Sequence, residues 1–226
     1  MVQGAPQVTV LLPARNEAAN LGWVLQRMPS FVDEVVLIDG DSHDETADLA
    51  VRHRPDIRVV HQGDGLGKGS GVRAGLRAGA GDILVVMDAD GSMSPDEIRA
   101  LIGPLHRGYD LVKGSRFRPG GGSHDITPWR RLGNRLLLTV LNALYATRHT
   151  DLCYGFWAVR REALDRLPLT ADGFEIEAEV IVRAVRAGLR IAEVPSVELA
   201  RRSGRSHLRS IPDGWRVLRV LLRVPV

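Results

Sequence analysis

Short apolar runs that alternate with stretches of helical spacing constrain this chain more than any other feature of its sequence. The runs lie at residues 8–12, 35–38, 57–60, 83–87, 109–113 and 189–194. Helices are expected at residues 74–78, 132–146, 162–167 and 214–224, and another opens at residue 174. Strands and helices that alternate in this way form βαβ units. The pattern therefore predicts a single α/β domain over residues 1–226, with a mostly parallel central sheet flanked by helices.

Three helix starts can be placed from their capping residues. Asn16 follows the first apolar run and is expected to cap the next helix. Ser42 with Glu45 three residues later matches a capping box, so a helix is expected directly after Ser42. Ser94 followed by Pro95 and two acids is typical of a helix N-terminus.

The composition restricts the ligands and the location. The chain has 226 residues, 44% of them hydrophobic and 25% charged, which is enough for one domain with its own core. A net charge of +3 permits an anionic ligand, whereas only 5% aromatic residues argues against nucleic-acid binding. The single cysteine, Cys153, excludes an internal disulfide, and we find neither an uncharged apolar run of 18 residues nor a signal peptide. We expect a cytoplasmic location, with peripheral contact at the inner face of a membrane left open.

The apolar run at 83–87 ends in two carboxylates one residue apart, Asp88 and Asp90. An unpaired buried carboxylate is costly, so the pair is expected at the mouth of the strand. Alternation along an extended chain would point the two side chains apart, but a turn at Ala89 would bring both to one cation. Two oxygen ligands at an open site suit Mg²⁺ or Mn²⁺ that also holds a diphosphate. A solvated loop with helix-capping acids is the alternative, and the position after a buried strand favours the metal.

Polar residues follow strand after strand in the predicted sheet. The clusters are residues 15–17, Asp39, the Asp88–Asp90 pair and residues 113–116. In open α/β sheets, ligands bind outside the carboxyl ends of the strands, where these clusters would meet. Turn chemistry explains each cluster singly, but it explains their convergence on one edge less well.

A glycine-rich segment at residues 63–71 does not match the usual nucleotide-binding loops. Gly63 lies one residue too close to Gly67 and Lys68 for a Walker A loop, and Gly69 stands where Ser or Thr is needed. The segment follows the third strand rather than the first, so the Rossmann fingerprint fails too. Its backbone amides and Lys68 can still face a phosphate, and a flexible loop with a solvated lysine is equally compatible with the sequence.

Arginines are dense in the second half of the chain, at residues 116–135 and 201–223. The first group lies beside the leucine-rich helix expected at residues 132–146. Arginines next to an apolar helix would suit a ligand with an anionic head and an apolar tail. The last helix, expected within residues 212–226, is basic and amphipathic, which is typical of contact with a membrane surface. The alternative is that it packs on the core with its arginines in water.

These features together resemble a family 2 glycosyltransferase with the GT-A (Rossmann-like) fold of nucleotide-diphospho-sugar transferases. Within that family the chain is similar to the dolichol/polyprenol-phosphate mannosyltransferase-like branch. The resemblance is carried by residues 12–17, Asp39, 41–46, 67–69, 88–90, 114–116, 130–131, Asp151, 155–156, 174–177 and 201–207.

The resemblance implies a role for each group of residues. The nucleotide would be held by Pro13, Arg15, Glu17, Ile38 and Asp39. The divalent metal and the diphosphate would be held by Asp88, Ala89 and Asp90. Phosphates of donor and lipid-phosphate acceptor would be handled by Arg116, Arg131, Arg201 and His207. The chain departs from the family at Arg15 (usually Tyr), at residues 39–42 (usually Asp-Asp-Gly-Ser) and at His207 (usually Lys).

The function expected is metal-dependent, inverting transfer of a sugar from a nucleotide-diphosphate sugar, GDP-mannose or a UDP-hexose, to a polyprenyl-phosphate-like acceptor. A phosphate acceptor is already an anion and needs no strong base, whereas a hydroxyl acceptor would need one, with Asp151 and Glu177 as candidates. Transfer to a soluble hydroxyl acceptor and a non-catalytic nucleotide-sugar-binding module are the alternatives. A nucleotidyltransferase would carry a glycine-rich loop directly after the first strand, and residues 13–17 contain no glycine.

Overall fold

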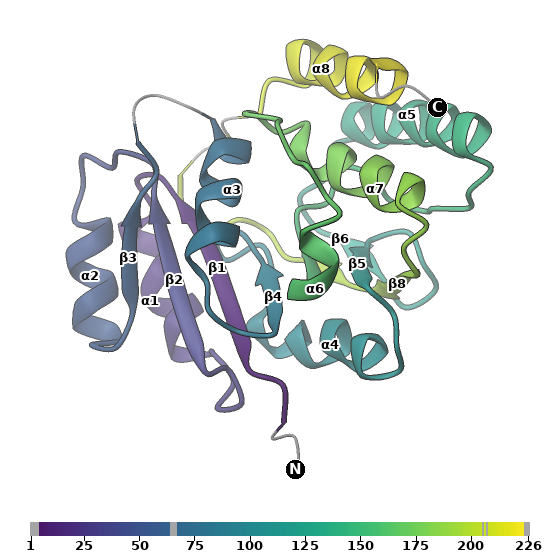
Figure 1. Cartoon of the computed structure of the whole chain (residues 1–226). Helices are drawn as coiled ribbons and strands as arrows, with labels where there is room; N and C mark the ends of the chain where they lie inside the picture. The colour runs from purple at the N-terminus through teal and green to yellow at the C-terminus, as the bar shows by residue number, and fades with distance from the viewer. Residues whose placement is uncertain (1–4, 64–66, 205, 207, 224–226) are drawn as a thin grey trace.

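A seven-stranded sheet runs through the protein in the order β3-β2-β1-β4-β7-β5-β8 (Figure 1). The computed structural model describes residues 5–63, 67–204, 206 and 208–223. The strands of this sheet are β1 (Val8–Ala14), β2 (Glu34–Asp39), β3 (Arg58–His61), β4 (Ile83–Val86), β5 (Leu111–Ser115), β7 (Trp157–Arg160) and β8 (Ile191–Pro195). A second, two-stranded sheet pairs β6 (Gly122–Ser123) with β9 (Val197–Glu198). The predicted α/β class with a mostly parallel sheet is confirmed, because only β7 runs against its neighbours.

Strand β7 is the one strand of the main sheet that the sequence did not predict. Its residues are buried on both faces of the sheet, so the sequence shows a short apolar run without the alternation that marks a strand. It lies between β4 and β5, antiparallel to both, with Val86 opposite Trp157. Because β7 is antiparallel, its start lies beside the end of β4. The segment before β7, residues 151–156, therefore reaches the edge at which Asp88 and Asp90 follow β4.

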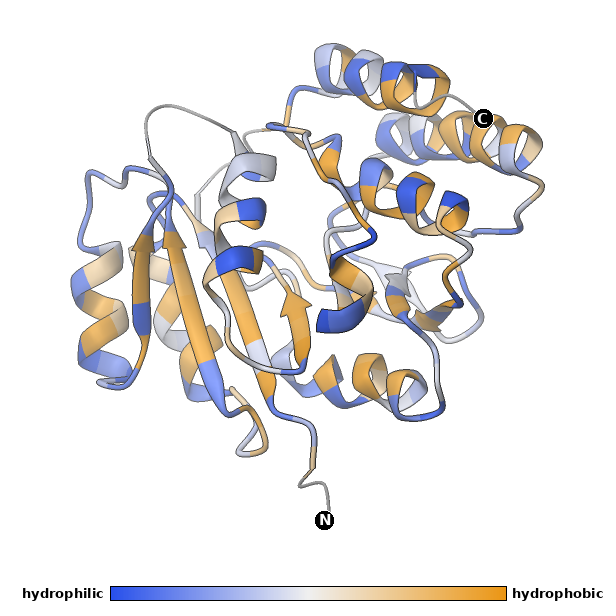
Figure 2. Cartoon of the chain, in the orientation of Figure 1, coloured by the Kyte–Doolittle hydropathy of each residue, from blue (hydrophilic) through white to orange (hydrophobic). Residues whose placement is uncertain are grey.

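Helices cover both faces of the sheet. They are α1 (Ala18–Gln26), α2 (Thr46–His53), α3 (Lys68–Ala78), α4 (Ile98–His106), α5 (Pro128–Tyr145), α6 (Arg161–Leu164), α7 (Ile176–Arg186) and α8 (Ser210–Arg223), with a short 3₁₀ helix at Pro95–Glu97. Helices α1, α2 and α4 share one core, and α3 with α5 to α8 share the other. Along β1 the alternation is visible directly: Val10 and Leu12 enter the first core and Leu11 the second. Figure 2 shows the resulting apolar strands between helices with mixed surfaces.

Two of the three predicted caps are wrong, and both for the same reason. The side chains of Asn16 and Ser42 do not cap their own helices but bind each other's loops. Ser42 Oγ accepts from the Asn16 amide at 3.0 Å, and Asn16 Oδ1 accepts from the His43 amide at 2.8 Å. The helices accordingly begin at Ala18 and Thr46 without a side-chain cap. Neighbouring parallel strands bring the two loops together, which local sequence spacing cannot indicate.

The third cap is confirmed, since Ser94 Oγ accepts from the amide of Asp96 at the start of the 3₁₀ helix that leads into α4. The described end of the glycine-rich segment, residues 67–71, leads into a helix. Gly67 precedes α3, and Lys68 is already the first residue of that helix. Residues 64–66 of the predicted segment lie outside the described residues. Lys68 is thus held by a helix end rather than by a flexible loop.

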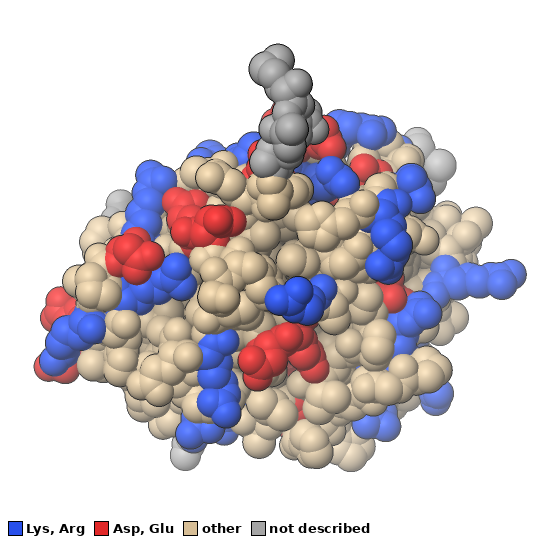
Figure 3. Space-filling model, turned by 90° about the horizontal axis from the view of Figure 1, so that it is seen from below, with Lys and Arg blue, Asp and Glu red and all other residues tan. Residues whose placement is uncertain are grey.

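The two ends of the strands differ in character. At the amino ends, seen from below in Figure 3, basic and acidic side chains are interspersed over the surface. At the carboxyl ends, charged side chains turn inward and pair with one another, as described below. No helix within the described residues is long and apolar enough to cross a membrane.

One buried carboxylate on α7 holds a loop that supports the carboxyl edge. Glu179 accepts hydrogen bonds from the amides of Thr170 and Ala171 and from Arg183. This loop packs directly on the start of α3, where the amide of Ser70 donates to the carbonyl of Asp172 at 3.2 Å. Burial alone would raise the pKa of Glu179, but these hydrogen bonds outweigh burial and lower it.

We expect Glu179→Gln to lower the free energy of unfolding at pH 7 by about 1.5–3 kcal/mol, because charge-assisted hydrogen bonds become neutral ones. A carboxylate whose pKa is lowered by folding stabilises the protein above its ordinary pKa of 4.5 and loses that contribution as the pH falls further. The gap between the two proteins should therefore narrow below that pH. Urea unfolding from pH 3 to 7 measures this difference in unfolding free energy. A difference that stays constant with pH would contradict the stabilising role of the Glu179 carboxylate.

Candidate active site

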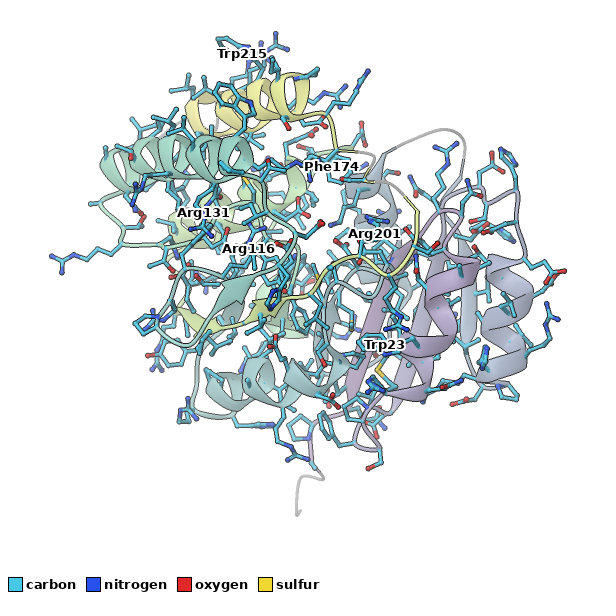
Figure 4. The ribbon with its side chains drawn as sticks, turned by 180° about the vertical axis from the view of Figure 1, so that it is seen from behind. Trp23, Arg116, Arg131, Phe174, Arg201 and Trp215 are labelled. Atoms are coloured by element: carbon cyan, nitrogen blue, oxygen red, sulfur yellow. The ribbon has the colours of Figure 1, made fainter. Side chains whose placement is uncertain are left out.

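A cleft of about 390 Å³ opens at the carboxyl edge of the sheet. Its walls come from the segments after β1, β4 and β5, from the start of α3 and α7, and from α5 and α8. Figure 4 shows Arg116, Phe174 and Arg201, which belong to three distant segments, around this one opening. The convergence predicted from separate strand ends is therefore present in the structure.

The first carboxylate, Asp88, is bound to Lys68. The Lys68 Nζ atom lies 2.6 Å from Asp88 Oδ1 and 2.9 Å from Glu177 Oε1, and it stands over the ring of Phe174. Burial alone would lower the pKa of the Lys68 ammonium, but the charges of Asp88 and Glu177 outweigh it and raise the pKa. Lys68 is therefore a fixed positive charge in the cleft.

Gly155, in the segment before β7, leaves the room that this arrangement needs. A Cβ atom at this position would lie 2.6 Å from Lys68 Nζ and 3.1 Å from Glu177 Oε1. Any side chain here would push the ammonium away from its two carboxylates. The glycine belongs to the segment that the unpredicted strand β7 brings beside β4.

The second carboxylate, Asp90, is bound to Arg201. One guanidinium nitrogen lies 2.6 Å from Asp90 Oδ2, and another lies 3.0 Å from Glu17 Oε1. Asp90 also accepts from the amide of Ser92 at 2.9 Å. Burial raises the pKa of Asp90, and the nearby charge of Asp88 raises it further. Burial likewise raises the pKa of Glu17.

The donor set fits a hard divalent cation. Asp88 and Asp90 both line the cleft, and each is neutralised by one basic side chain. Among the described residues no group of three or more Asp, Glu, His or Cys side chains is placed to hold a metal. The protein would thus supply two carboxylates and leave the other positions to diphosphate oxygens and water, a pattern usual for Mg²⁺ at phosphate sites. Ala89, between the two aspartates in the sequence, also lines the cleft.

Arg116 is held by two carboxylates, and two aromatic rings pack on its guanidinium. Its Nε and Nη2 atoms donate to the two oxygens of Asp151 at 2.7 and 3.0 Å, and its Nη1 atom donates to Glu198 at 3.1 Å. Burial would lower the pKa of Arg116, but the charges of Asp151 and Glu198 outweigh it and raise the pKa. Asp151 is fully buried and does not line the cleft. Of the two predicted bases, Glu177 alone faces the cleft, and Lys68 binds it.

Another buried cation lies behind Arg116, and the sequence analysis did not predict it. Lys113 on β5 is fully buried, and its ammonium donates to the carbonyl of Tyr154. Burial lowers the pKa of Lys113, against the charges of Asp151 and Glu177 that raise it. The run of residues 113–116 at the end of a predicted strand was the available indication.

Only some of the residues predicted to hold a nucleotide line the cleft. Pro13, Arg15 and Glu17 line the cleft. Asp39 is buried beside it; its Oδ2 atom accepts from the Ser42 amide, and its Oδ1 atom has no hydrogen-bond partner among the described residues. A buried acceptor without a donor is costly, so Asp39 is a position at which a ligand donor would be favourable.

Ile38 differs in its position from the other residues predicted to hold the nucleotide. Its side chain is fully buried, and Gly75 of α3 packs so closely on it that an added Cβ would lie 2.7 Å from Ile38 Cδ1. It is not among the residues that line the cleft. The cause is strand alternation, because successive side chains of β2 point to opposite faces and Ile38 takes the core-facing position before Asp39.

Two neighbouring arginines of α5 differ in whether they reach the cleft. Arg131 is exposed, with its guanidinium over the ring of Phe117, and it does not line the cleft (Figure 4). Its neighbour Arg130 lines the cleft and donates to the Leu208 carbonyl and Ser206 Oγ, each at 3.4 Å. The last predicted residue, His207, lies outside the described residues.

We expect Arg116→Ala to lower the free energy of unfolding by about 3–5 kcal/mol, because it leaves the buried carboxylate of Asp151 without its partner. The double variant Arg116→Ala/Asp151→Ala should lose less than the sum of the two single variants. Urea unfolding measures the cycle. Arg118→Ala is the matched control: this neighbouring arginine is 44% exposed and lies 3.9 Å from Glu193, so its loss should change little. Additive losses at residues 116 and 151 would refute the coupling.

Comparison with known proteins places these features in context. A model of the family described as glycosyl transferase family 2 matches residues 9–167. Polyprenol monophosphomannose synthase of Mycolicibacterium smegmatis is 32% identical over 221 residues, covering 92% of this chain and 83% of that protein. Undecaprenyl-phosphate mannosyltransferase of Micrococcus luteus is 33% identical over 219 residues, covering 89% and 87%.

The fold also resembles that of a solved glycosyltransferase structure. Glucosyl-3-phosphoglycerate synthase from Mycobacterium tuberculosis, crystallised with Mn²⁺, UDP and glucosyl-3-phosphoglycerate, superposes with a TM-score of 0.75 at 28% identity. The match covers 96% of this chain and 79% of that one. The fold around the cleft is thus found in a protein that binds a nucleotide and a divalent metal.

Proposed function

The chain belongs to glycosyl transferase family 2, and we propose that it transfers a sugar from a nucleotide-diphosphate sugar to a polyprenyl phosphate or a similar lipid phosphate. It is a glycosyltransferase with the GT-A fold, and its relatives include polyprenyl-phosphate mannosyltransferases. The observation that carries the finer proposal is the cleft itself. It joins two carboxylates, several basic side chains and an apolar stretch between α5 and α8 in one continuous opening.

The donor would occupy the part of the cleft just beyond the carboxyl ends of β1 and β4. Arg15 and Glu17 line that part of the cleft and would face the nucleotide. Asp39 lies behind this wall, with its buried Oδ1 atom unpaired among the described residues, and would accept from the ribose or base only after the wall shifts. Asp88 and Asp90 would hold Mg²⁺ or Mn²⁺, which supplies positive charge that stabilises the leaving diphosphate. The Mn²⁺ and UDP in the similar crystal structure support this arrangement.

Lys68 and Arg201 would act on the diphosphate as well. Each now neutralises one of the two carboxylates at 2.6 Å, and each can exchange a carboxylate oxygen for a phosphate oxygen. Preorganised cations of this kind favour the charge that develops on a leaving group. Glu177 and Glu17 remain as second partners, so neither cation would be left unpaired during the exchange.

The acceptor would enter from the side of α5 and α8. The cleft there is lined by Arg130 together with the apolar side chains of Ile126, Leu137 and Val217. Among the described residues the Arg130 guanidinium is held only by two hydrogen bonds of 3.4 Å from one nitrogen, and such a group beside apolar walls suits a phosphorylated head with a hydrocarbon tail. A phosphate oxygen can attack the anomeric carbon directly with inversion, so no free base is required. This agrees with Glu177 being bound to Lys68 and with Asp151 being buried.

A second candidate is transfer to a small soluble phosphorylated acceptor. It is favoured by the structural similarity to a synthase crystallised with glucosyl-3-phosphoglycerate. The same basic cleft would bind the phosphate of such an acceptor. The apolar lining between α5 and α8 would then have no ligand to contact, which is why we place this candidate second.

A donor and acceptor panel tests the proposal. GDP-mannose, UDP-glucose and UDP-N-acetylglucosamine are each offered with Mg²⁺ or Mn²⁺ and with polyprenyl phosphate, 3-phosphoglycerate or no acceptor. We expect transfer to polyprenyl phosphate that is abolished by excess EDTA and by Asp90→Asn. Asp96→Asn, an acid on the nearby 3₁₀ helix, is the control and should transfer normally. Full turnover in EDTA would refute the metal site, and transfer to 3-phosphoglycerate alone would establish the second candidate.

The acceptor phosphate is tested by two neighbouring arginines. We expect Arg130→Ala to reduce transfer to polyprenyl phosphate roughly ten- to hundredfold while sparing donor hydrolysis, because a charge-assisted contact is worth about 1.5–3 kcal/mol. Arg131→Ala, outside the cleft, should have a much smaller effect. Initial rates with the donor from the panel measure both. The opposite order would return the role to Arg131, as the family resemblance implies.

A further inference from the structure

Large apolar side chains are exposed almost exclusively on α5 and α8. Of the eight that are exposed among the described residues, only Val51 lies elsewhere. The other seven are Trp129, Leu132, Leu136 and Leu144 on α5 and Ile211, Trp215 and Leu222 on α8. Trp215 and Leu136 are each 60% exposed. Scattered single apolar residues on a surface need no explanation, but a group confined to two helices marks an interaction site.

Helix α8 has two apolar faces rather than one. At about 100° of rotation per residue, Trp215 and Leu222 lie within roughly 40° of Ile211, so the three form one exposed stripe. Val217 and Leu221, roughly 100° away, are buried in the core. The burial of one face therefore leaves a second apolar face without a partner inside the protein.

The two helices that carry these exposed side chains lie next to each other. The two helices pack together, and the hydroxyl of Tyr145 at the end of α5 donates to the carbonyl of Leu221 at 2.9 Å. Figure 1 shows them side by side at one end of the molecule, and Figure 4 places Trp215 at the outer edge, away from Arg116 and Arg201. We refer to the seven exposed side chains together as the α5–α8 face.

The charges around this face favour one kind of partner. The two helices carry six arginines and one aspartate, and that aspartate, Asp213, is buried. The six are Arg130, Arg131, Arg135, Arg216, Arg219 and Arg223. A second copy of the chain would bring these like charges together across the contact. An anionic lipid bilayer would instead attract them while its hydrocarbon accepts the apolar side chains.

We infer that the α5–α8 face docks this protein on the surface of anionic lipid bilayers. Trp129 and Trp215 suit the interface in particular, because an indole places an apolar ring and a polar N–H at the boundary of the two phases. The same helices line the cleft through Trp129, Leu137 and Val217, so a docked molecule would hold its cleft open beside the bilayer. The inference rests on the proposed function, because a lipid-phosphate acceptor is embedded in a bilayer and the enzyme must reach it there.

Sedimentation with lipid vesicles tests the inference without any donor or acceptor. The full chain is mixed with vesicles of equal parts phosphatidylglycerol and phosphatidylcholine, or of phosphatidylcholine alone. We expect binding to the anionic vesicles that weakens as salt is raised, since the Debye length falls from about 10 Å at 0.1 M to about 3 Å at 1 M. Arg219→Gln/Arg223→Gln should weaken this binding at low salt, whereas Arg77→Gln on α3 should not.

The apolar part of the surface is tested by Leu136→Ser/Trp215→Ser, which alters one exposed residue on each helix and no residue that lines the cleft. We expect its partition coefficient on anionic vesicles to fall about tenfold or more, with an unchanged thermal unfolding midpoint. Val51→Ser, the exposed apolar residue on α2, is the matched control and should bind like the parent protein. Because binding is read without turnover, it fails or succeeds independently of the donor and acceptor panel.

Three results would overturn the inference. The parent protein could fail to sediment with anionic vesicles, or the double variant could bind them as well as the parent does. The parent protein could also be a dimer in solution that becomes monomeric on Leu136→Ser/Trp215→Ser, which would assign this face to a second copy of the chain. Light scattering of both proteins distinguishes that last case.

Discussion

The structure depends on neutralising carboxylates at the end of β4. Asp88 and Asp90 stand where the buried strand opens into the cleft, and Lys68 and Arg201 bind them at 2.6 Å each. An unpaired charge in such a place would cost several kcal/mol, so the two cations must be delivered there by other elements. Helix α3 brings one, and the segment after β9 brings the other. The candidate active site is therefore also the point where segments far apart in the sequence are joined by ion pairs.

Each of the two cations is shared with a second carboxylate. Lys68 also contacts Glu177, and Arg201 also contacts Glu17. This redundancy suits a site whose ligand is itself an anion, because a cation can leave one carboxylate for a phosphate without losing its other partner. Arg116 differs, since Asp151 and Glu198 both bind it while the rings of Phe117 and Tyr154 pack on its guanidinium. It supports the wall of the cleft, and the more open arginine at that wall is Arg130.

The cleft also joins two surfaces of different character. Its inner part is built from strand ends and is charged, while its outer part lies between α5 and α8 and is apolar. A donor with two phosphates suits the first part and a lipid phosphate suits the passage between them. Helices α5 and α8 therefore serve as cleft wall on one side and as exposed surface on the other.

The sequence by itself determined the alternation of strands and helices, the mostly parallel sheet, and the carboxyl edge at which Asp88 and Asp90 would act. These follow from local apolar runs and turn residues, which depend on neighbours in the chain. Only the tertiary structure decided that β7 enters between β4 and β5 and brings Gly155 against Lys68. It also decided that Ile38 faces the core and that Arg130 rather than Arg131 faces the cleft. The reason is physical: burial, ion pairing and helix packing are set by residues far apart in sequence, and no local pattern carries that information.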